Sequence, residues 1–356
     1  MIIRFLLFLF CSFSLFSHEI LTYGDAIIDY IVFVDDAFLD NLPGGTGGSD
    51  QVDLETFALL TKNYLKKCPG SSSVNTMKGL ALLGHSSTVI GRIGNDADGK
   101  DYAQSLLSYG ITPAFTECNT YTGRIVAMIS PDGHRTMRSC VGCLVGFDAF
   151  AVAPELFQDI SLFHVEGYQI PNFSFLKELA TLAKESVALI SMDTGCHELV
   201  TKFKAQLLDL ITNDLDILFT NDEEAFALTG LSPEKACLEL AKLCTYVVVT
   251  CGEKGGYVAS QGQFLHYDAI PVDLVDDTGA GDCFIAGFLH GILTDQPLEK
   301  CAKSGALIAS KVSQLIGAEL PHDLVLEKSD IGDDHEIGVD FVSEDTTNRI
   351  EGCTGS

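Results

Sequence analysis

A short glycine-rich turn ends in a carboxylate at the start of an apolar segment with helical spacing. Gly279, Ala280 and Gly281 precede Asp282, and the apolar run 283–289 follows. Backbone N–H groups at a helix N-terminus lack intrahelical partners and favour an anion there. Small residues let a phosphate approach the backbone, and a neighbouring carboxylate can accept the proton of an attacking hydroxyl. The pattern predicts a phosphoryl-transfer site with Asp282 as general base, although the cap of an ordinary helix has the same spacing.

The stretch from Asp276 to Asp282 resembles the C-terminal signature of the ribokinase-like (phosphofructokinase B type) carbohydrate and nucleoside kinases. In that family the last aspartate is the catalytic base. Asp277 departs from the pattern, because family members usually have threonine or another small residue there. The resemblance implies ATP as phosphoryl donor and Mg2+ as cofactor. It also implies a monovalent cation such as K+, with Asp276 at a matching position for this metal.

A polar cluster follows the buried run 216–220. Asn221 and Glu224 match the family's Asn-x-x-Glu element, which implies a role in supporting Mg2+ near the phosphates. Oxygen ligands suit this ion, which keeps most of its waters and takes few protein contacts. The same two residues also fit an N-cap and the acidic first turn of a helix, and the two roles are compatible.

The run 247–256 resembles the family's strand-to-turn nucleotide element. In that reading Thr250 and Gly252 line the phosphates or the ribose, and Gly255 lines the nucleoside. A plain β-turn with glycine at positive φ explains the glycines equally well. Residues 304–318 resemble the helix and turn that flank the adenine.

Positions for the phosphoryl acceptor are implied in the N-terminal part of the chain. Asp29, at the end of the first predicted strand, resembles the family's sugar-binding aspartate, and a carboxylate can hold two vicinal hydroxyls. The second acceptor segment matches the family's N-terminal signature at Gly70, Ser71, Ser72 and Asn75. Ser71 replaces the family's second glycine, which leaves the choice of acceptor open. The serines also fit the N-cap of a helix.

The segment Asp132–Met137 resembles the adenosine-kinase-like branch of the family. There the arginine, Arg135 in this chain, reaches the phosphates from a lid and offsets developing charge. An exposed hairpin arginine paired with a neighbouring acid is the alternative. Residues 166–168 and 317–321 resemble the same branch, so the resemblance covers residues 19–321.

Strand-like and helix-like patterns alternate between these motifs. Apolar, β-branched runs that predict strands are 20–34, 88–94, 123–130, 162–167, 187–193, 216–220 and 246–250. Segments with helical periodicity are 73–83, 99–108, 173–184, 234–243, 280–293 and 298–315. The alternation predicts an α/β fold of the ribokinase-like, Rossmann-like type, with a mostly parallel central sheet flanked by helices and ligands at the carboxyl ends of its strands. Residues 30–50 and 111–140 are predicted to form a small β lid.

The two ends of the chain differ from the predicted kinase domain, residues 19–321. Residues 1–18 have the positive start and apolar core of a secretory leader. A kinase that uses ATP is expected in the cytoplasm, which argues against export. The alternatives to a leader are therefore a true start of the protein further downstream and an additional apolar arm that packs on the domain. Residues 322–356 predict an acidic, disordered tail.

Composition limits the partners. A chain of 356 residues, 47% of them hydrophobic, is long enough for one large domain. A net charge of −27 argues against a nucleic acid or a stable membrane partner, because both need clustered positive charge. The twelve cysteines do not form a disulfide pattern. Cys140 and Cys143 have metal spacing but lack a second pair, so no structural zinc is expected.

Together these patterns predict an ATP-dependent kinase that phosphorylates a primary hydroxyl of a sugar or a purine nucleoside. The alternatives are a simple sugar kinase of the ribokinase or fructokinase type and a non-catalytic nucleotide- or sugar-binding relative. Lid closure would exclude water from the site. The resemblance also implies that a homodimer formed through the lid is compatible with this chain.

Overall fold

The computed structural model describes residues 19–24, 26–40, 42, 49–130, 135–144, 152–318, 320–321 and 339–341. The predicted leader, most of residues 40–50 of the predicted lid and most of the predicted tail lie outside these residues. Three residues of that tail, Val339–Phe341, are described and form a strand that pairs antiparallel with Gln263–Tyr267.

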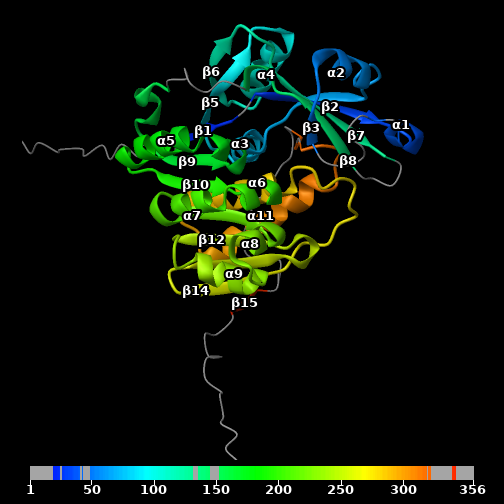
Figure 1. Cartoon of the computed structure of the whole chain (residues 1–356). Coiled ribbons are helices and arrows are strands. Elements are labelled where there is room, and N and C mark those ends of the chain that lie inside the picture. Colours follow the sequence, from blue (N-terminus) through cyan, green and yellow to red (C-terminus); the bar gives the residue numbers. More distant parts are fainter. Residues whose placement is uncertain are drawn as a thin grey trace, which may run out of the picture.

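A large sheet runs through the middle of the molecule (Figure 1). Its strands, in spatial order, are β15 (Val339–Phe341), β14 (Gln263–Tyr267), β13 (Gly256–Ser260), β12 (Tyr246–Thr250), β11 (Ile217–Asn221), β10 (Leu189–Asp193), β9 (Ile160–Glu166), β1 (Glu19–Tyr23), β5 (Ser87–Gly94) and β6 (Thr112–Cys118). From β6 to β12 neighbouring strands are parallel, and the last pairs are antiparallel. The parallel strands therefore end at one common edge, where ligands bind in such sheets.

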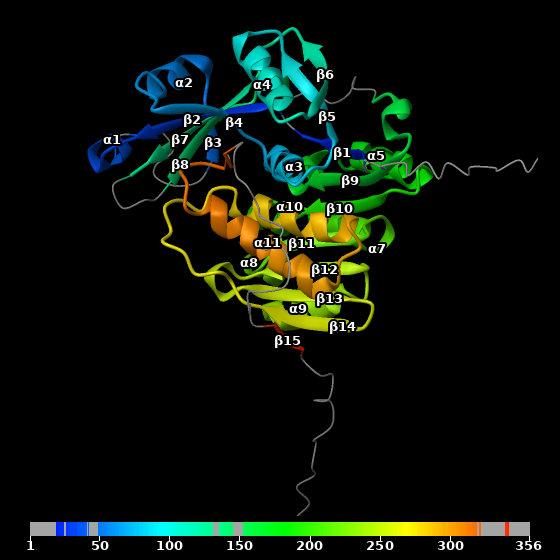
Figure 2. The same ribbon diagram turned by 180° about the vertical axis from the view of Figure 1, so that it is seen from behind.

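A second, smaller sheet projects from the β5–β6 end of the large one (Figure 2). Its strands, in spatial order, are β3 (Ser49–Gln51), β8 (Arg135–Cys140), β7 (Gly123–Ile129), β2 (Ile27–Phe33) and β4 (Lys66–Pro69). One face is covered by α2 (Leu54–Leu60), whose Phe57 and Leu60 pack against Val126 and Met128. The small sheet thus has an apolar core of its own.

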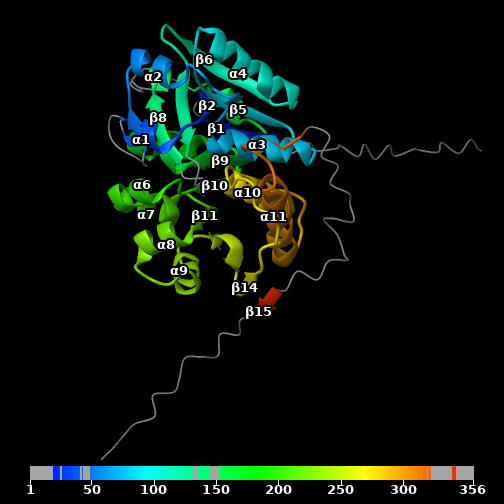
Figure 3. The same cartoon turned by 90° about the vertical axis from the view of Figure 1, so that its right-hand side faces the viewer.

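Helices cover both faces of the large sheet, as the side view shows (Figure 3). On one face lie α5 (Phe173–Glu185), α6 (His197–Lys202), α7 (Lys204–Asn213), α8 (Asp222–Thr229) and α9 (Pro233–Leu240). On the other lie α3 (Ser72–Leu82), α4 (Ala97–Ser108), α10 (Ala280–Leu293) and α11 (Leu298–Val312). A short helix, α1 (Asp36–Asp40), follows β2, and single 3-10 turns cover Gly142–Leu144, Pro154–Phe157, Gly167–Asn172 and Gly252–Lys254. The arrangement confirms the predicted ribokinase-like α/β fold with a mostly parallel sheet.

The first predicted strand, 20–34, is two strands in the structure. β1 ends at Tyr23 and pairs with β5 and β9, whereas β2 begins at Ile27 and pairs with β4 and β7 in the small sheet. Gly24 lies between them, and a Cβ there would stand 2.7 Å from Ser73 Oγ. Apolar periodicity cannot detect such a change of sheet, because both strands are rich in apolar residues. Asp29 therefore lies within β2 and not at the end of the first strand.

The small sheet also differs from the predicted lid, 30–50 and 111–140. Residues Thr112–Cys118 form β6, which pairs in parallel with β5 and so belongs to the large sheet. The strand Lys66–Pro69, outside the predicted ranges, joins the small sheet beside β2. Strand pairing between distant segments decides these memberships, and a single sequence does not show it.

The described residues give two further results that bear on the predictions. None of their helices is both long and apolar enough to cross a membrane. Cys140 and Cys143 are free, buried thiols, and they contact different backbone carbonyls, those of Val52 and Arg92.

Candidate active site

Asp282 lies in the first turn of α10, where α10 meets the start of α3. Ser72 Oγ donates to its Oδ1 over 2.6 Å, and Asn75 Nδ2 donates to its Oδ2 over 2.8 Å. Thr76 Oγ1 also donates to the Asp282 backbone carbonyl, 3.2 Å away. The structure therefore brings together the predicted base and two predicted acceptor-binding residues that are more than 200 positions away in sequence.

Burial raises the pKa of Asp282, and the hydrogen bonds from Ser72 and Asn75 partly oppose that rise. Both donors are neutral groups, so neither adds a positive charge that would hold the carboxyl strongly in its ionised form. A carboxylate whose pKa is raised in this way is a better proton acceptor than one paired with a cation.

The turn before Asp282 leaves space above its backbone. Gly279 has φ = 76°, and a Cβ there would lie 2.5 Å from the Cβ of Ala318. A Cβ on Gly281, in contrast, would meet no atom within 4 Å. Gly281 is exposed and Ala280 is partly buried. The backbone at the start of this 14-residue helix is thus open on the side of Gly281, where a phosphate could approach it.

The start of helix α3 is stabilised by a residue from a strand of the large sheet. Glu166, at the end of β9, accepts from the Ser73 backbone N–H over 2.8 Å and from Ser71 Oγ over 3.4 Å. Ser71 occupies the N-cap position, as predicted, but its side chain makes no capping bond. Its φ of 87° lies in the region where a non-glycine residue is strained and which glycine adopts readily.

Asp29 and Gly70 form a second contact on the acceptor side. A Cβ on Gly70 would lie 2.4 Å from Asp29 Oδ2, so the carboxylate rests directly over the glycine. Gly70 and Ser72 are two residues apart, and Ser72 contacts Asp282. The predicted acceptor carboxylate and the predicted base therefore adjoin the same short segment, 70–72.

Asn221 and Glu224 form a capping box at the start of α8. Asn221 Oδ1 accepts from the Glu224 N–H over 2.8 Å, and Glu224 Oε2 accepts from the Asn221 N–H over 3.1 Å. Thr194 Oγ1 also donates to Glu224 Oε2 over 2.5 Å. The capping alternative is thus confirmed. Oxygen lone pairs remain on both side chains, so they fit a magnesium ion that is bound through water molecules.

Asp193 was not singled out from the sequence, although it ends a predicted strand. It lies at the carboxyl end of β10, on the same edge as Glu166 and Asn221. Burial raises its pKa well above the usual value, and the charges of Glu224, Asp282 and Glu166 raise it further. These carboxylates therefore face one region. Position at the carboxyl end of a buried parallel strand is the sequence signal that could have identified Asp193.

The remaining predicted residues occupy loops around this edge. Thr250 ends β12, and the glycines Gly252 and Gly255 follow with φ of 57° and 77°. A Cβ on Gly255 would lie 1.8 Å from the Tyr267 carbonyl oxygen, so that glycine is required by the turn itself. The Arg135 backbone pairs with Ile129 at the start of β8, and its side chain lies outside the described residues.

Asp276 braces the loop before α10. Its Oδ1 accepts from the Thr278 N–H over 2.9 Å and from Thr278 Oγ1 over 2.6 Å. Its Oδ2 accepts from the Gly317 N–H over 2.9 Å, which ties this loop to the turn after α11. Among the described residues, no three His, Cys, Asp or Glu side chains are arranged to hold a metal ion. An ion near Asp276 would therefore need backbone or water ligands as well.

Comparisons with known proteins agree with this geometry. Cytidine kinase of Thermococcus kodakarensis is 30% identical over 252 residues, which cover 68% of this chain and 87% of that enzyme. Fructokinase of Klebsiella pneumoniae is 27% identical over 72% of this chain and 82% of its own length. The crystal structure of adenosine kinase from Sinorhizobium meliloti superposes with a TM-score of 0.78 and 27% identity, covering 87% of this chain and 97% of that one.

A family model described as pfkB family carbohydrate kinase matches residues 18–323. This range is almost the same as the one over which the motifs were recognised, so the predicted family is confirmed. The relatives act on both sugars and nucleosides, and the acceptor class is not decided by them. The chain belongs to the pfkB family of carbohydrate kinases and is a phosphotransferase of the sugar and nucleoside kinase class.

Proposed function

We propose that this chain transfers the γ-phosphoryl group of ATP to a primary hydroxyl of a sugar or a nucleoside, with Asp282 as the base. The observation that carries the proposal is the contact of Ser72 and Asn75 with Asp282, because it joins the acceptor segment to the proton acceptor. Kinases of this family use ATP and typically Mg2+. A bound Mg2+ would neutralise phosphate charge during the transfer.

The acceptor would lie between Asp29 and Asp282, over the segment Gly70–Ser72. Its hydroxyls would be held by the Asp29 carboxylate and by the polar groups of Ser71 and Asn75. Asn75 Oδ1 is buried and has no hydrogen-bond partner, so it has a free lone pair for a hydroxyl of the acceptor. The reacting hydroxyl would replace Ser72 or Asn75 as the donor to Asp282 and then give up its proton to that carboxylate.

The phosphates would lie against the open backbone of Gly279–Gly281, where the N–H groups of α10 stabilise negative charge. Asn221 and Glu224 would support Mg2+ through its waters, and Thr250, Gly252 and Gly255 would line the nucleotide. Arg135 would approach the phosphates from the small sheet, acting as a lid that excludes water. Asp276 would take part in a monovalent-cation site.

ADP release by the purified protein tests this function. The assay uses Mg-ATP with adenosine, cytidine, ribose or fructose in turn, and the Asp282→Asn variant runs in parallel. Turnover that depends on one acceptor and is lost in the variant supports the proposal and identifies the acceptor class. ATP or acceptor binding without turnover for any compound favours the non-catalytic alternative.

A further inference from the structure

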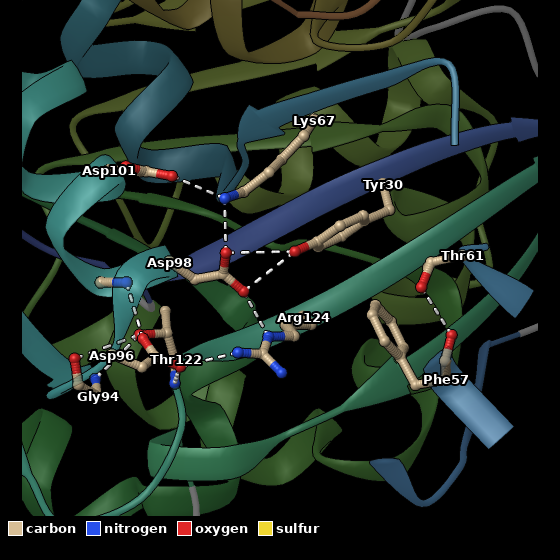
Figure 4. Close-up of polar contacts among 11 residues, drawn as sticks. Tyr30, Phe57, Thr61, Lys67, Gly94, Asp96, Asp98, Asp101, Thr122 and Arg124 are labelled. Carbon is tan, nitrogen blue, oxygen red and sulfur yellow. Dashed lines mark hydrogen bonds and ion pairs between the residues drawn. The ribbon is translucent and has the colours of Figure 1, made fainter. Parts of the chain in front are cut away.

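Asp98, in the first turn of α4, gathers three donors from three neighbouring strands of the small sheet (Figure 4). Lys67 Nζ of β4 lies 2.6 Å from Oδ1, and Arg124 Nε of β7 lies 2.5 Å from Oδ2. Tyr30 of β2 points its hydroxyl between the two oxygens, at 3.2 and 3.1 Å. The Asp98 side chain is only 8% exposed, so solvent competes weakly for these contacts.

All three donors lie on one face of the small sheet, and Asp29 lies on the other. Tyr30 is paired with Lys67 across the β2–β4 register, and Ile28 is paired with Arg124 across the β2–β7 register. Since successive residues of a strand point to opposite faces, Tyr30, Lys67 and Arg124 share a face. Asp29 precedes Tyr30 and points to the opposite face, over Gly70.

A second carboxylate of the same turn holds the chain where it passes from the large sheet to the small one. Asp96, the N-cap of α4, accepts from the Thr122 N–H over 3.1 Å and from Thr122 Oγ1 over 2.7 Å. Arg124 Nη2 donates to the same carboxylate over 2.8 Å. Thr122 directly precedes β7, so the start of α4 contacts both the connection and the sheet that it leads to.

We infer that Asp98 is a positioning residue for the acceptor site: it fixes β2, β4 and β7 to α4 and thereby sets the place of Asp29 over Gly70. The inference rests on the proposed function, because it assumes that Asp29 binds the acceptor. Asp98 joins the small sheet to α4, which packs on the large sheet, through charge-assisted bonds, whose direction restricts sliding of the strands more than apolar packing does. A displacement of about 1 Å at a substrate-holding group is enough to impair binding or turnover.

The electrostatic environment agrees with a tight cluster. Burial and the neighbouring Asp98 charge raise the pKa of Tyr30 to about 12, so its hydroxyl stays protonated and remains a donor. Burial alone would lower the pKa of Lys67, but its hydrogen bonds with Asp101 and Asp98 outweigh that effect and raise it. Tyr30 and Lys67 therefore keep their protons near neutral pH and remain donors to Asp98.

The test compares Asp98→Asn with a matched control, Asp214→Asn. Asp214 is also 8% exposed and also pairs with two cationic side chains, Lys177 Nζ at 2.5 Å and Lys184 Nζ at 2.7 Å. These lysines belong to α5, on the opposite face of the large sheet. Both substitutions keep the side-chain shape and remove two ion pairs. They differ in whether the lost contacts hold the strand that carries Asp29.

For the acceptor that gives turnover in the screen, we expect Asp98→Asn to raise the acceptor KM by roughly 3- to 30-fold, equivalent to the loss of one modest contact. The KM for ATP should stay within about twofold, since Asp98 holds β2, β4 and β7 but not β8, which carries Arg135, and the other proposed nucleotide residues lie outside the small sheet. Asp214→Asn should change neither constant. Equal effects of the two variants on the acceptor KM would overturn the inference, because the cluster would then act on stability alone.

Hydrogen–deuterium exchange of the full chain provides a readout that does not need an acceptor. Asp98→Asn should speed exchange in Ile27–Phe33 and Lys66–Pro69, whereas Asp214→Asn should leave these strands at the wild-type rate. If Asp98→Asn leaves exchange in both strands at the wild-type rate, the inference is contradicted, even if the enzyme is active. Failure of wild-type protein to turn over any acceptor would instead remove the proposed function, and the exchange result would still decide whether Asp98 holds the strands.

Discussion

The first turns of α4 and α10 each contain an aspartate, and the two carboxylates have different surroundings. Asp98 in α4 accepts from Lys67, Arg124 and Tyr30, so two of its donors are cations. Asp282 in α10 accepts from the neutral side chains of Ser72 and Asn75. The same residue type in the first turn of a helix therefore serves two purposes. Cations hold a carboxylate as a structural anchor, whereas neutral donors leave it able to take a proton.

The largest effect is expected for Asp282→Asn, which removes the proposed proton acceptor. We expect kcat to fall by about 10²–10⁴-fold, the usual contribution of a positioned general base. Steady-state kinetics with the acceptor found in the screen measures the loss. The free energy of unfolding at pH 7 should not fall, because burial disfavours the ionised carboxyl that the substitution removes. Turnover near the wild-type value would remove the contrast between the two aspartates.

Asp98→Ala should lower the free energy of unfolding, the quantity that Asp282→Asn is not expected to lower. Removing the carboxylate takes one of two counter-charges from each of Lys67 and Arg124, which are 23% and 21% exposed, and leaves them paired with Asp101 and Asp96 alone. We expect a loss of about 2 kcal/mol in the free energy of unfolding, less than for a fully buried pair because solvent reaches both cations. Denaturant unfolding measures it. A loss as large in Asp282→Asn would mean that the two carboxylates are equivalent structural anchors.

A smaller effect, and an increase in stability, is expected for Ser71→Gly, a substitution next to the donors of Asp282. Ser71 has φ = 87°, and glycine adopts this conformation without steric cost. We expect the free energy of unfolding to rise by about 1 kcal/mol, which is at the lower end of the cost of such backbone strain. Ser71→Ala is the matched control, since it removes the hydroxyl but keeps the strain, and it should give no gain. Equal stability of the glycine and alanine variants would show that the backbone there is not strained.

The smallest change is expected for Ser72→Ala, which removes one neutral donor from Asp282. The hydrogen bond from Ser72 lowers the pKa of Asp282 against the larger, raising effect of burial. The acid limb of the kcat/KM profile should therefore move to higher pH in the variant. Ser108→Ala, which removes an exposed hydroxyl at the far end of α4, should leave the limb in place. A limb that moves to lower pH would contradict the proposed role of Ser72.

The same pKa direction has a consequence for stability. Asp282 has a higher pKa in the folded chain than in the unfolded chain, so the folded state binds the proton more tightly. Its contribution to stability is therefore largest below the unfolded pKa and is lost as the pH rises through the folded pKa. Ser72→Ala should extend that loss to higher pH, which unfolding measurements across the acid range would detect.

Several features could be predicted from neighbouring residues alone. The helix predicted at 280–293 is observed with the same bounds, because apolar spacing and a preceding glycine are local signals. The capping box of Asn221 and Glu224 is also a pattern of four consecutive residues. The order of such motifs along the chain was sufficient to identify the family and the class of reaction.

Other features exist only in the folded chain. Glu166 supplies the acceptor that the side chain of the N-cap residue Ser71 does not supply at the start of α3, and Asp98 holds Tyr30 and Lys67 from a different segment. The small sheet takes Lys66–Pro69 and leaves Thr112–Cys118 to the large one. Local propensity covers only a few residues, whereas strand pairing and cross-chain hydrogen bonds depend on how the whole core packs. The sequence by itself therefore determined local features such as the helix 280–293, the capping box of Asn221 and Glu224 and the chemistry that these motifs carry. The tertiary structure decided which carboxylate is held by cations and which stays able to accept a proton, because those partners come from distant segments.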